Sequence, residues 1–296
     1  MQSHRLCVAA VQARVEPRAY HRNRERLESV LDSLAPERPD VIVMSEMFLQ
    51  GHWYDADRLR PEYAEPIEGP TLTWMRAQSR RLGAMLVGGI SERLDGDDRC
   101  GSTLLLVDGD TLLATYRKRH PAAAELLFMQ PGTTPTVVDT RLGRLGLLTC
   151  YDMSFPECVL DTFTRRADLV LLCNAWLEME RMPFLIGQQF EHHRVLPRAI
   201  AMQLRAPVVA ANLVGPLRMV VPGIPAFGGR VYEFDSEFAG GSIICDHMGV
   251  VLEERPKDQG EGFIVAELDL ALSRGVRSVT LDDAGLDVVR RHVFGR

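Results

Sequence analysis

Residues 143–157, GRLGLLTCYDMSFPE, join an apolar run to a helical pattern within a few positions. The apolar run ends at Cys150. Ser154 and Glu157 then have the S-x-x-E spacing of a helix capping box, and Pro156 falls in the first turn, where a missing N–H costs nothing. This segment predicts a strand that turns sharply into a helix, with Cys150 in the turn.

A cysteine in such a turn is a candidate nucleophile. The positive end of a helix dipole favours the thiolate form of Cys150, and the backbone N–H of Tyr151 would point to where an oxyanion forms. The alternative is that Cys150 is a small buried apolar residue, as isolated cysteines usually are. The strand–turn–helix context favours the nucleophile.

Apolar runs typical of buried strands recur along the chain. Most are continuous rather than alternating, which indicates strands covered on both faces. Helical patterns lie between several of them, at 20–35, 156–167 and 185–205. This alternation, followed by strand-rich sequence, predicts a layered α/β fold with the helices outside. The runs cover residues 5–11, 40–45, 84–91, 102–107, 145–150, 168–175, 207–213, 241–246 and 262–268.

The composition excludes several classes of protein. The chain has 296 residues, 46% of them hydrophobic, and a formal net charge of −6, so we expect neither a nucleic-acid nor an acidic-membrane partner. The N-terminus does not resemble a secretory signal, and no window reaches the roughly 18 apolar residues of a membrane span. The six cysteines lack tight spacing and are expected to be reduced thiols. A cytoplasmic protein is predicted.

Two charged residues end other apolar runs. Glu46 follows PDVIVMS at the strand edge where α/β folds place their sites, and Lys118 ends TLLATYRK. A carboxylate can serve as the base that a cysteine nucleophile needs, and an ammonium can stabilise a thiolate or an oxyanion. Taken alone, Lys118 would usually be a surface lysine, and the alternative for Glu46 is an exposed loop carboxylate or a member of an ion pair.

Together these segments resemble the nitrilase, or carbon–nitrogen hydrolase, superfamily, whose signature is a Glu-Lys-Cys triad at three strand ends plus a second glutamate after the lysine. PDVIVMSEMF resembles the motif of the first glutamate, YRKRHPAAAELLFMQPG the lysine motif, with Glu125 in the second-glutamate position, and CYDMSFPE the cysteine motif. The resemblance spans about residues 5–270. It implies a four-layer α-β-β-α sandwich over residues 1–275. The charge-rich end of the sequence, 276–296, is expected to form either a C-terminal arm that packs on a partner subunit or a frayed terminus.

The resemblance also implies a mechanism. Glu46 would take the proton of Cys150, whose sulfur attacks a carbonyl carbon to form a thioester. Lys118 and the N–H of Tyr151 would hold the oxyanion. Glu125 would keep Lys118 charged and orient the substrate amine or water. No metal or cofactor is required, and a homodimer or larger homo-oligomer is expected.

The substrate is less constrained by the motifs. The CYD start is similar to amidases, whereas nitrile-cleaving members usually show CWE, and residues 191–215 resemble the carbamoyl-amine branch. These features favour a small linear amide or an N-carbamoyl amine over a nitrile. Ser154 stands where many amidases carry arginine, so the motif does not assign the chain to one subfamily. The candidate pocket residues are Trp53, Tyr54, Asn174 and Trp176.

Two readings from other classes remain. A metallohydrolase could use Glu191, His192, His193, Asp246 and His247, but adjacent histidines point to different helix faces and no HExxH spacing occurs. A non-catalytic scaffold that kept the fold should lack part of the triad, which is complete here. A histidine base is also disfavoured, since neither His120 nor the His192–His193 pair follows a strand end.

Overall fold

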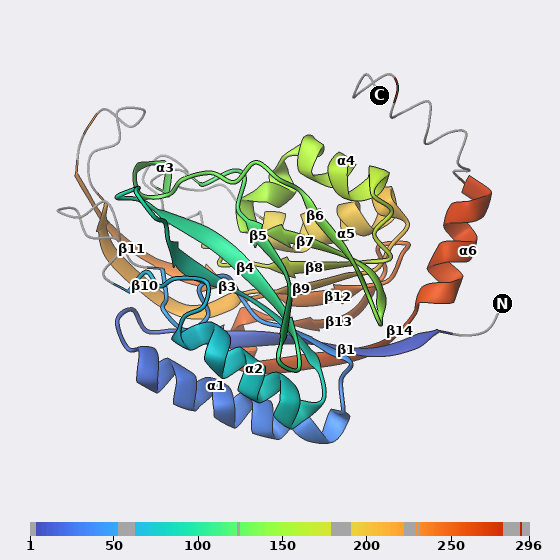
Figure 1. Cartoon of the computed structure of the whole chain (residues 1–296), viewed down its shortest axis with the longest axis horizontal. Helices are drawn as coiled ribbons and strands as arrows, with labels where there is room; N and C mark the ends of the chain where they lie inside the picture. Colours follow the sequence, from blue (N-terminus) through green and yellow to red (C-terminus); the bar gives the residue numbers. More distant parts are fainter. Residues whose placement is uncertain are drawn as a thin grey trace.

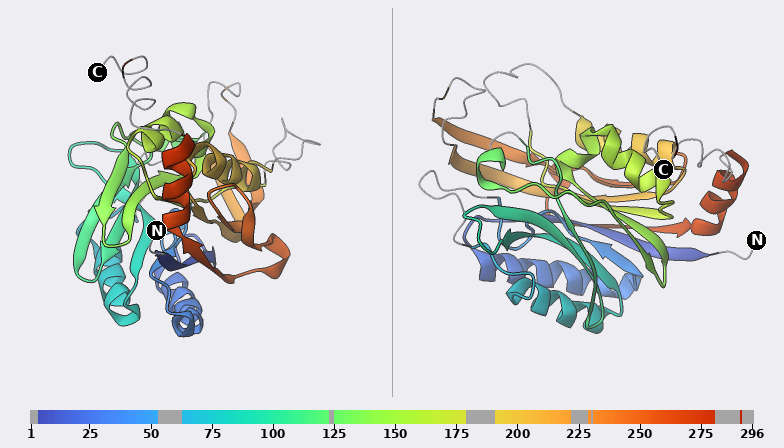
Figure 2. Two further views of the ribbon diagram at one scale, coloured as in Figure 1. Left: turned by 90° about the vertical axis from the view of Figure 1, so that its right-hand side faces the viewer. Right: turned by 45° about the horizontal axis from the view of Figure 1, so that its top comes forward.

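The computed structural model describes residues 4–52, 63–122, 125–178, 191–221, 229, 231–280 and 291. Two β-sheets lie against each other, and helices cover their outer faces (Figure 1). Figure 2 shows the same layers from two other directions. This arrangement confirms the four-layer α-β-β-α sandwich expected from the sequence.

The larger sheet has eight strands in the order β11-β10-β1-β2-β3-β4-β5, with β14 also paired to β1. Its centre is parallel, from β10 through β1 and β2 to β3, and β4 and β5 follow antiparallel. The strands are β1 Arg5–Arg14, β2 Val41–Val43, β3 Met85–Arg93, β4 Cys100–Asp108, β5 Thr111–Arg117, β10 Leu213–Val221, β11 Tyr232–Ala239 and β14 Gly262–Asp269.

The smaller sheet has six strands in the order β13-β12-β9-β8-β7-β6. Its central strands β7, β8 and β9 are parallel, so their carboxyl ends meet at one edge of the sheet. The strands are β6 Thr136–Thr140, β7 Gly143–Thr149, β8 Leu169–Cys173, β9 Val208–Ala211, β12 Ser242–Cys245 and β13 Val251–Arg255.

Two helices cover each sheet. Helices α1 and α2 lie on the larger sheet, and α4 and α5 lie on the smaller one (Figure 1). The sequence predicted α1, α4 and α5, but it did not predict α2. The helices are α1 Tyr20–Leu34, α2 Pro70–Leu82, α3 Glu125–Phe128, α4 Pro156–Thr164, α5 His192–Leu204 and α6 Leu270–Thr280, with short 3-10 helices η1 Ala35–Glu37, η2 Cys150–Ser154 and η5 Lys257–Gln259.

The core explains why the apolar runs are continuous. Val8 and Val43 of the larger sheet belong to one buried cluster with Leu147 and Leu171 of the smaller sheet. The alternate residues of the same strands, such as Ala9, pack on the other side in a cluster that includes α1 and α2. Both faces of the central strands are therefore buried, and each fully buried aliphatic side chain contributes about 1.5–3 kcal/mol to folding.

The end of the chain crosses the predicted domain boundary. Helix α6 runs through residue 275 without a break, and its side chains Arg274 and Arg277 are paired with Asp168 at the start of β8. Beyond α6 only Arg291 is among the described residues, so the division at 275/276 and the C-terminal arm stay predictions. Among the described residues, the structure has no helix of the length and apolarity that a membrane span needs.

Candidate functional site

The turn at Cys150 has the predicted position. Strand β7 ends at Thr149, and the short helix η2 begins at Cys150 itself. The capping box, however, is wrong: Ser154 is the last residue of η2, so the cap of α4 moves on to Phe155, whose side chain has no acceptor. Pro156 is the first residue of α4, as expected.

The backbone of Cys150 is held in an unusual conformation. Its φ is +47°, in the left-handed region, which costs a non-glycine residue about 1–2 kcal/mol. The Cys150 N–H donates to Asn174 Oδ1 at 3.1 Å, and the Asn174 carbonyl accepts the N–H of Glu46 at 3.2 Å. Asn174 thus connects the segments that carry the thiol and the carboxylate. Strained backbone that the surroundings hold in place is common at functional sites.

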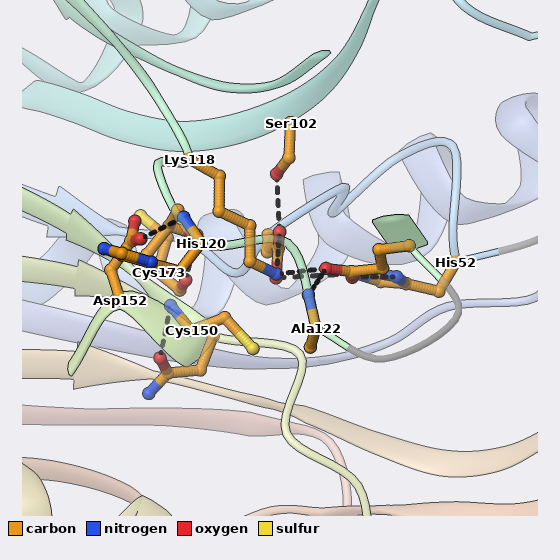
Figure 3. A network of polar contacts seen from close by, with 12 residues as sticks. His52, Ser102, Lys118, His120, Ala122, Cys150, Asp152 and Cys173 are labelled. Carbon is orange, nitrogen blue, oxygen red and sulfur yellow. Dashed lines mark hydrogen bonds and ion pairs between the residues drawn. The ribbon is translucent and has the colours of Figure 1, made fainter. Parts of the chain in front are cut away.

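Three of the predicted site residues meet in one buried ion-pair network. Lys118 Nζ lies 3.1 Å from Glu46 Oε1 and 2.7 Å from Glu125 Oε2. Glu46 and Lys118 are only 0% and 1% exposed, and Cys150 is 6% exposed. Figure 3 shows Lys118 and Cys150 within this network of polar contacts.

Backbone and hydroxyl groups fix the network. Ser102 of β4 donates from Oγ to Glu46 Oε1 at 2.5 Å, and its carbonyl accepts the Lys118 N–H at 2.8 Å. The N–H of Ala122 donates to Glu125 Oε2 at 2.6 Å. The second oxygen of Glu46, Oε2, is buried and has no hydrogen-bond partner among the described residues. That oxygen faces His52 Nε2 at 3.6 Å and is the atom of Glu46 that can accept a proton.

The charges of the network follow from competition between burial and ion pairing. Burial alone would raise the pKa of Glu46, but Lys118, together with His52 and Ser102, holds it well below its usual value. Burial would lower the pKa of Lys118, but its ion pairs with Glu125 and Glu46 hold it well above its usual value. Lys118 is therefore an ammonium and Glu46 a carboxylate.

The thiol departs from the sequence-based expectation. Burial raises the pKa of Cys150 well above its usual value, and Glu46 and Glu125 add to this rise, while Lys118 opposes it. The resting group is thus a thiol, not the thiolate that a helix dipole would favour. The physical reason is that η2 is only five residues long, so its dipole is weak, whereas Cys150 is almost entirely removed from water.

His52 was not predicted from the sequence. It is buried, with Nε2 at 3.6 Å from Glu46 Oε2 and Nδ1 at 3.7 Å from Glu125 Oε1. The available signal was its place six residues after Glu46, in the same connection. A single imidazole thus faces both carboxylates. Figure 3 shows the position of His52 in the network.

The other residues predicted for the oxyanion site and the substrate pocket do not belong to the ion-pair network. Tyr151 is the second residue of η2, and the first N–H groups of a helix have no partner within it. The ring of Trp176 is buried, 6.2 Å from that of Tyr151 and 5.8 Å from that of His192. Asn174 uses its side-chain oxygen on the Cys150 backbone, as described above. Trp53 and Tyr54 lie outside the described residues.

Two groups of side chains among the described residues have donor atoms close enough for a metal ligand set: Glu46, His52 and Glu125, and His120, Asp152 and Cys158. In the first group the Lys118 ammonium already bridges the two carboxylates, so a metal ion would meet a like charge. Neither group contains the residues of the metallohydrolase alternative, Glu191, His192, His193, Asp246 and His247.

Comparison with known proteins finds several that are similar over most of the chain. The chain is 27% identical over 242 residues to a 2-oxoglutaramate amidase of Bacillus subtilis, covering 80% of this chain and 81% of that protein. It is 27% identical over 289 residues to a nitrilase of Pyrococcus abyssi, covering 97% of this chain and 98% of that protein. The crystal structure of a CN-hydrolase superfamily protein from Xanthomonas campestris superposes with a TM-score of 0.74 at 25% identity, covering 93% and 95% of the two chains.

The family assignment rests on most of the chain. Residues 7–278 match the Carbon-nitrogen hydrolase family, and this range contains both sheets except the first two residues of β1, together with the whole ion-pair network. The chain belongs to the carbon–nitrogen hydrolase family of the nitrilase superfamily.

Proposed function

We propose that this protein hydrolyses a linear amide or an N-carbamoyl amine through a thioester on Cys150. The observation that carries the proposal is the Lys118 ammonium, which bridges Glu46 and Glu125 in a buried site beside a thiol on a sharp turn. An ammonium, a carboxylate and a thiol can serve as the oxyanion donor, the base and the nucleophile of acyl transfer to sulfur.

In the first half of the reaction, Glu46 Oε2 accepts the proton of Cys150 while the sulfur bonds to the substrate carbonyl carbon. Because the pKa of the thiol is raised, proton transfer is coupled to this attack, and no free thiolate is stored beforehand. Lys118 Nζ and the N–H of Tyr151 stabilise the oxyanion, one such donor being worth roughly 3–4 kcal/mol. Glu46 then protonates the departing amine, and the thioester remains.

In the second half, Glu46 takes a proton from water, and the hydroxide adds to the thioester carbon. Collapse of this intermediate returns the proton to the sulfur and releases the acid. Glu125 holds Lys118 charged throughout, because its Oε2 is the nearer of the two carboxylate contacts. His52 faces both glutamates and helps to fix their orientation.

The substrate class is supported by the motif and by one relative. The segment after Cys150 reads Tyr151-Asp152, which is similar to amidases, and the Bacillus subtilis relative is a 2-oxoglutaramate amidase. A linear amide is therefore the first choice, and an N-carbamoyl amine the second. The Pyrococcus abyssi relative is a nitrilase, so nitriles belong in the same test.

The test is a panel of small amides, N-carbamoyl amines and nitriles, assayed for acid, ammonia and carbon dioxide. Carbon dioxide accompanies ammonia only when a carbamoyl group is cleaved, whereas amides and nitriles give the acid and ammonia and are distinguished by which compound is consumed. We expect turnover of at least one amide or carbamoyl compound, abolished in Cys150→Ala and retained in Cys245→Ala, a buried cysteine of β12 remote from the ion pairs. Turnover that survives Cys150→Ala would refute the proposed mechanism.

A further inference from the structure

A second buried carboxylate lies beside the site, and the mechanism above does not use it. Asp152 is fully buried, two residues after Cys150 in η2. Its oxygens accept hydrogen bonds from the Tyr116 hydroxyl at 2.8 Å, from the Arg119 N–H at 3.1 Å and from the His120 N–H at 2.8 Å. All three donors come from the other sheet and the segment that follows it.

These donors flank Lys118 on both sides. Tyr116 lies two residues before it on β5, and Arg119 and His120 are the next two residues after it. Asp152, on the turn that carries the nucleophile, therefore accepts hydrogen bonds from the chain both before and after the lysine. Figure 3 shows Asp152 beside His120. The contacts join residues that are 32 to 36 positions apart in the sequence.

The cations nearby are directed elsewhere. The Arg119 guanidinium pairs with Asp161 at 2.6 Å, and the His120 ring stacks on Phe155 with Nε2 3.1 Å from Glu157. Asp152 thus binds two backbone N–H groups and a phenol rather than a charged side chain. Such a site suits a group that fixes the path of a chain, because N–H donors have fixed directions.

We infer that Asp152 is a positioning residue that holds the Lys118 ammonium against the Cys150 sulfur across the two sheets. This inference rests on the proposed function of Lys118 and Cys150. Elsewhere the inner faces of the two sheets meet mainly through apolar side chains, whose contacts are not directional. A misplacement of about 1 Å in a reacting group can cost on the order of 10²-fold in rate, so a directional tie at this point matters.

The test compares Asp152→Ala with Asp152→Asn, which keeps an acceptor for Arg119 and His120 but removes the charge. For the best substrate of the panel, we expect Asp152→Ala to lower kcat about 10²-fold with little change in KM, and Asp152→Asn to stay within about tenfold of the parent. Tyr116→Phe, which removes one of the three donors, should fall between the parent and Asp152→Ala. Asp161→Asn, which removes only the side-chain partner of Arg119, is the matched control and should be unchanged.

A second measurement does not depend on turnover. The pH profile of Cys150 alkylation by iodoacetamide, followed by intact mass, reports the pKa of the thiol. Loss of a nearby negative charge alone would lower that pKa in both Asp152 variants, whereas withdrawal of Lys118 would raise it in Asp152→Ala only. If no substrate of the panel is turned over, the proposed function fails, and this profile still decides the role of Asp152.

Three results would overturn the inference. The first is a kcat and an alkylation profile of folded Asp152→Ala equal to those of the parent. The second is an equal loss in Asp152→Ala and Asp152→Asn, which would mean that the charge itself is used. The third result applies if Asp152→Ala does not fold. It is a parent-like kcat in Tyr116→Phe, together with a thiol pKa in Asp152→Asn that is higher than in the parent.

Discussion

Glu46 and Asp152 are both buried carboxylates beside Cys150, yet their acidities are shifted in opposite directions. Burial would raise both, but Lys118 pairs directly with Glu46 and holds the pKa of that carboxyl well below its usual value. Asp152 has only neutral hydrogen-bond donors, and burial raises its pKa to about 7. Glu46 is therefore held as a charged group, whereas the contacts of Asp152 fix the position of the chain.

This difference shows that burial does not set the charge of a group by itself. A carboxylate in a dry interior stays ionised when a cation neutralises it, and it becomes a weak acid when its partners are neutral. The ion pair lies where the proposed chemistry needs a base, Glu46, and a donor to the oxyanion, Lys118. The neutral donors sit where only position is needed.

The largest effect is expected from Lys118→Met, which removes the charge that defines the Glu46 side. Breaking a buried ion pair leaves uncompensated charge and costs about 3–5 kcal/mol, and the loss of an oxyanion donor lowers kcat about 10²–10³-fold. Denaturant unfolding and steady-state kinetics measure the two effects. The control is Lys257→Met, whose two glutamate partners are partly exposed and which should cost less than about 1 kcal/mol. An equal loss of unfolding free energy in Lys118→Met and Lys257→Met would show that the buried ion pair is no stronger than the partly exposed one.

The second effect is a pH dependence of stability from Asp152. Its folded pKa, about 7, is above the unfolded value of 3.8, so the folded state disfavours the charged form. Stability from this group is full below about pH 4, falls as the pH rises towards 7 and is level above that, a span on the order of 4 kcal/mol. Asp152→Asn should flatten the unfolding free energy between pH 4 and 7. A parent-like slope in that variant would contradict the raised pKa.

Glu46 makes stability depend on pH with the opposite sign. The folded pKa of Glu46 is lowered, so its stabilisation is present above its unfolded pKa and is lost as the pH falls below it. Glu46 and Asp152 therefore act on stability in different pH windows.

A smaller effect is expected from Ser102→Ala. This change removes the 2.5 Å hydrogen bond to Glu46 Oε1 and leaves Lys118 as the remaining partner of that oxygen. A hydrogen bond to a charged group is worth about 1.5–3 kcal/mol, so we expect a roughly tenfold to hundredfold loss of kcat. Ser91→Ala on the neighbouring strand β3, another buried serine, is the matched control and should leave kcat unchanged. A parent-like kcat in Ser102→Ala would mean that Lys118 alone orients Glu46.

The smallest effect concerns the backbone of Cys150. At an ordinary position, glycine is less stable than alanine by about 0.5–1 kcal/mol, but a left-handed residue costs about 1–2 kcal/mol unless it is glycine. Because φ is +47°, Cys150→Gly should be at least as stable as Cys150→Ala in denaturant unfolding. A clear advantage for alanine would show that the turn relaxes without the thiol.

The sequence was most informative where a polar residue ends an apolar run. Glu46, Lys118 and Cys150 were picked out in this way, and the strand ends bring Lys118 onto Glu46 and Glu125. Their catalytic roles stay proposals. The layered fold also followed from the continuous runs, because both faces of the central strands are buried.

The parts that were missed leave no clear local pattern in the sequence. Ser102 meets Glu46 across 56 residues of sequence, and Asp152 meets Tyr116 across 36, so neither contact leaves a local pattern. The edge strands β6 and β13 lack fully buried runs, since each has only intermediate or exposed residues. The capping box failed because a 3-10 turn of five residues intervenes before α4.

The central claim is that Cys150 carries the acyl group of the substrate. The direct measurement is intact mass of the enzyme quenched during turnover, with peptide mapping and treatment with hydroxylamine. The account predicts an adduct with the mass of the acyl group, located on Cys150 and released by hydroxylamine as a thioester is. Steady turnover with an adduct on another residue, or with undiminished rate in Cys150→Ala, would contradict it.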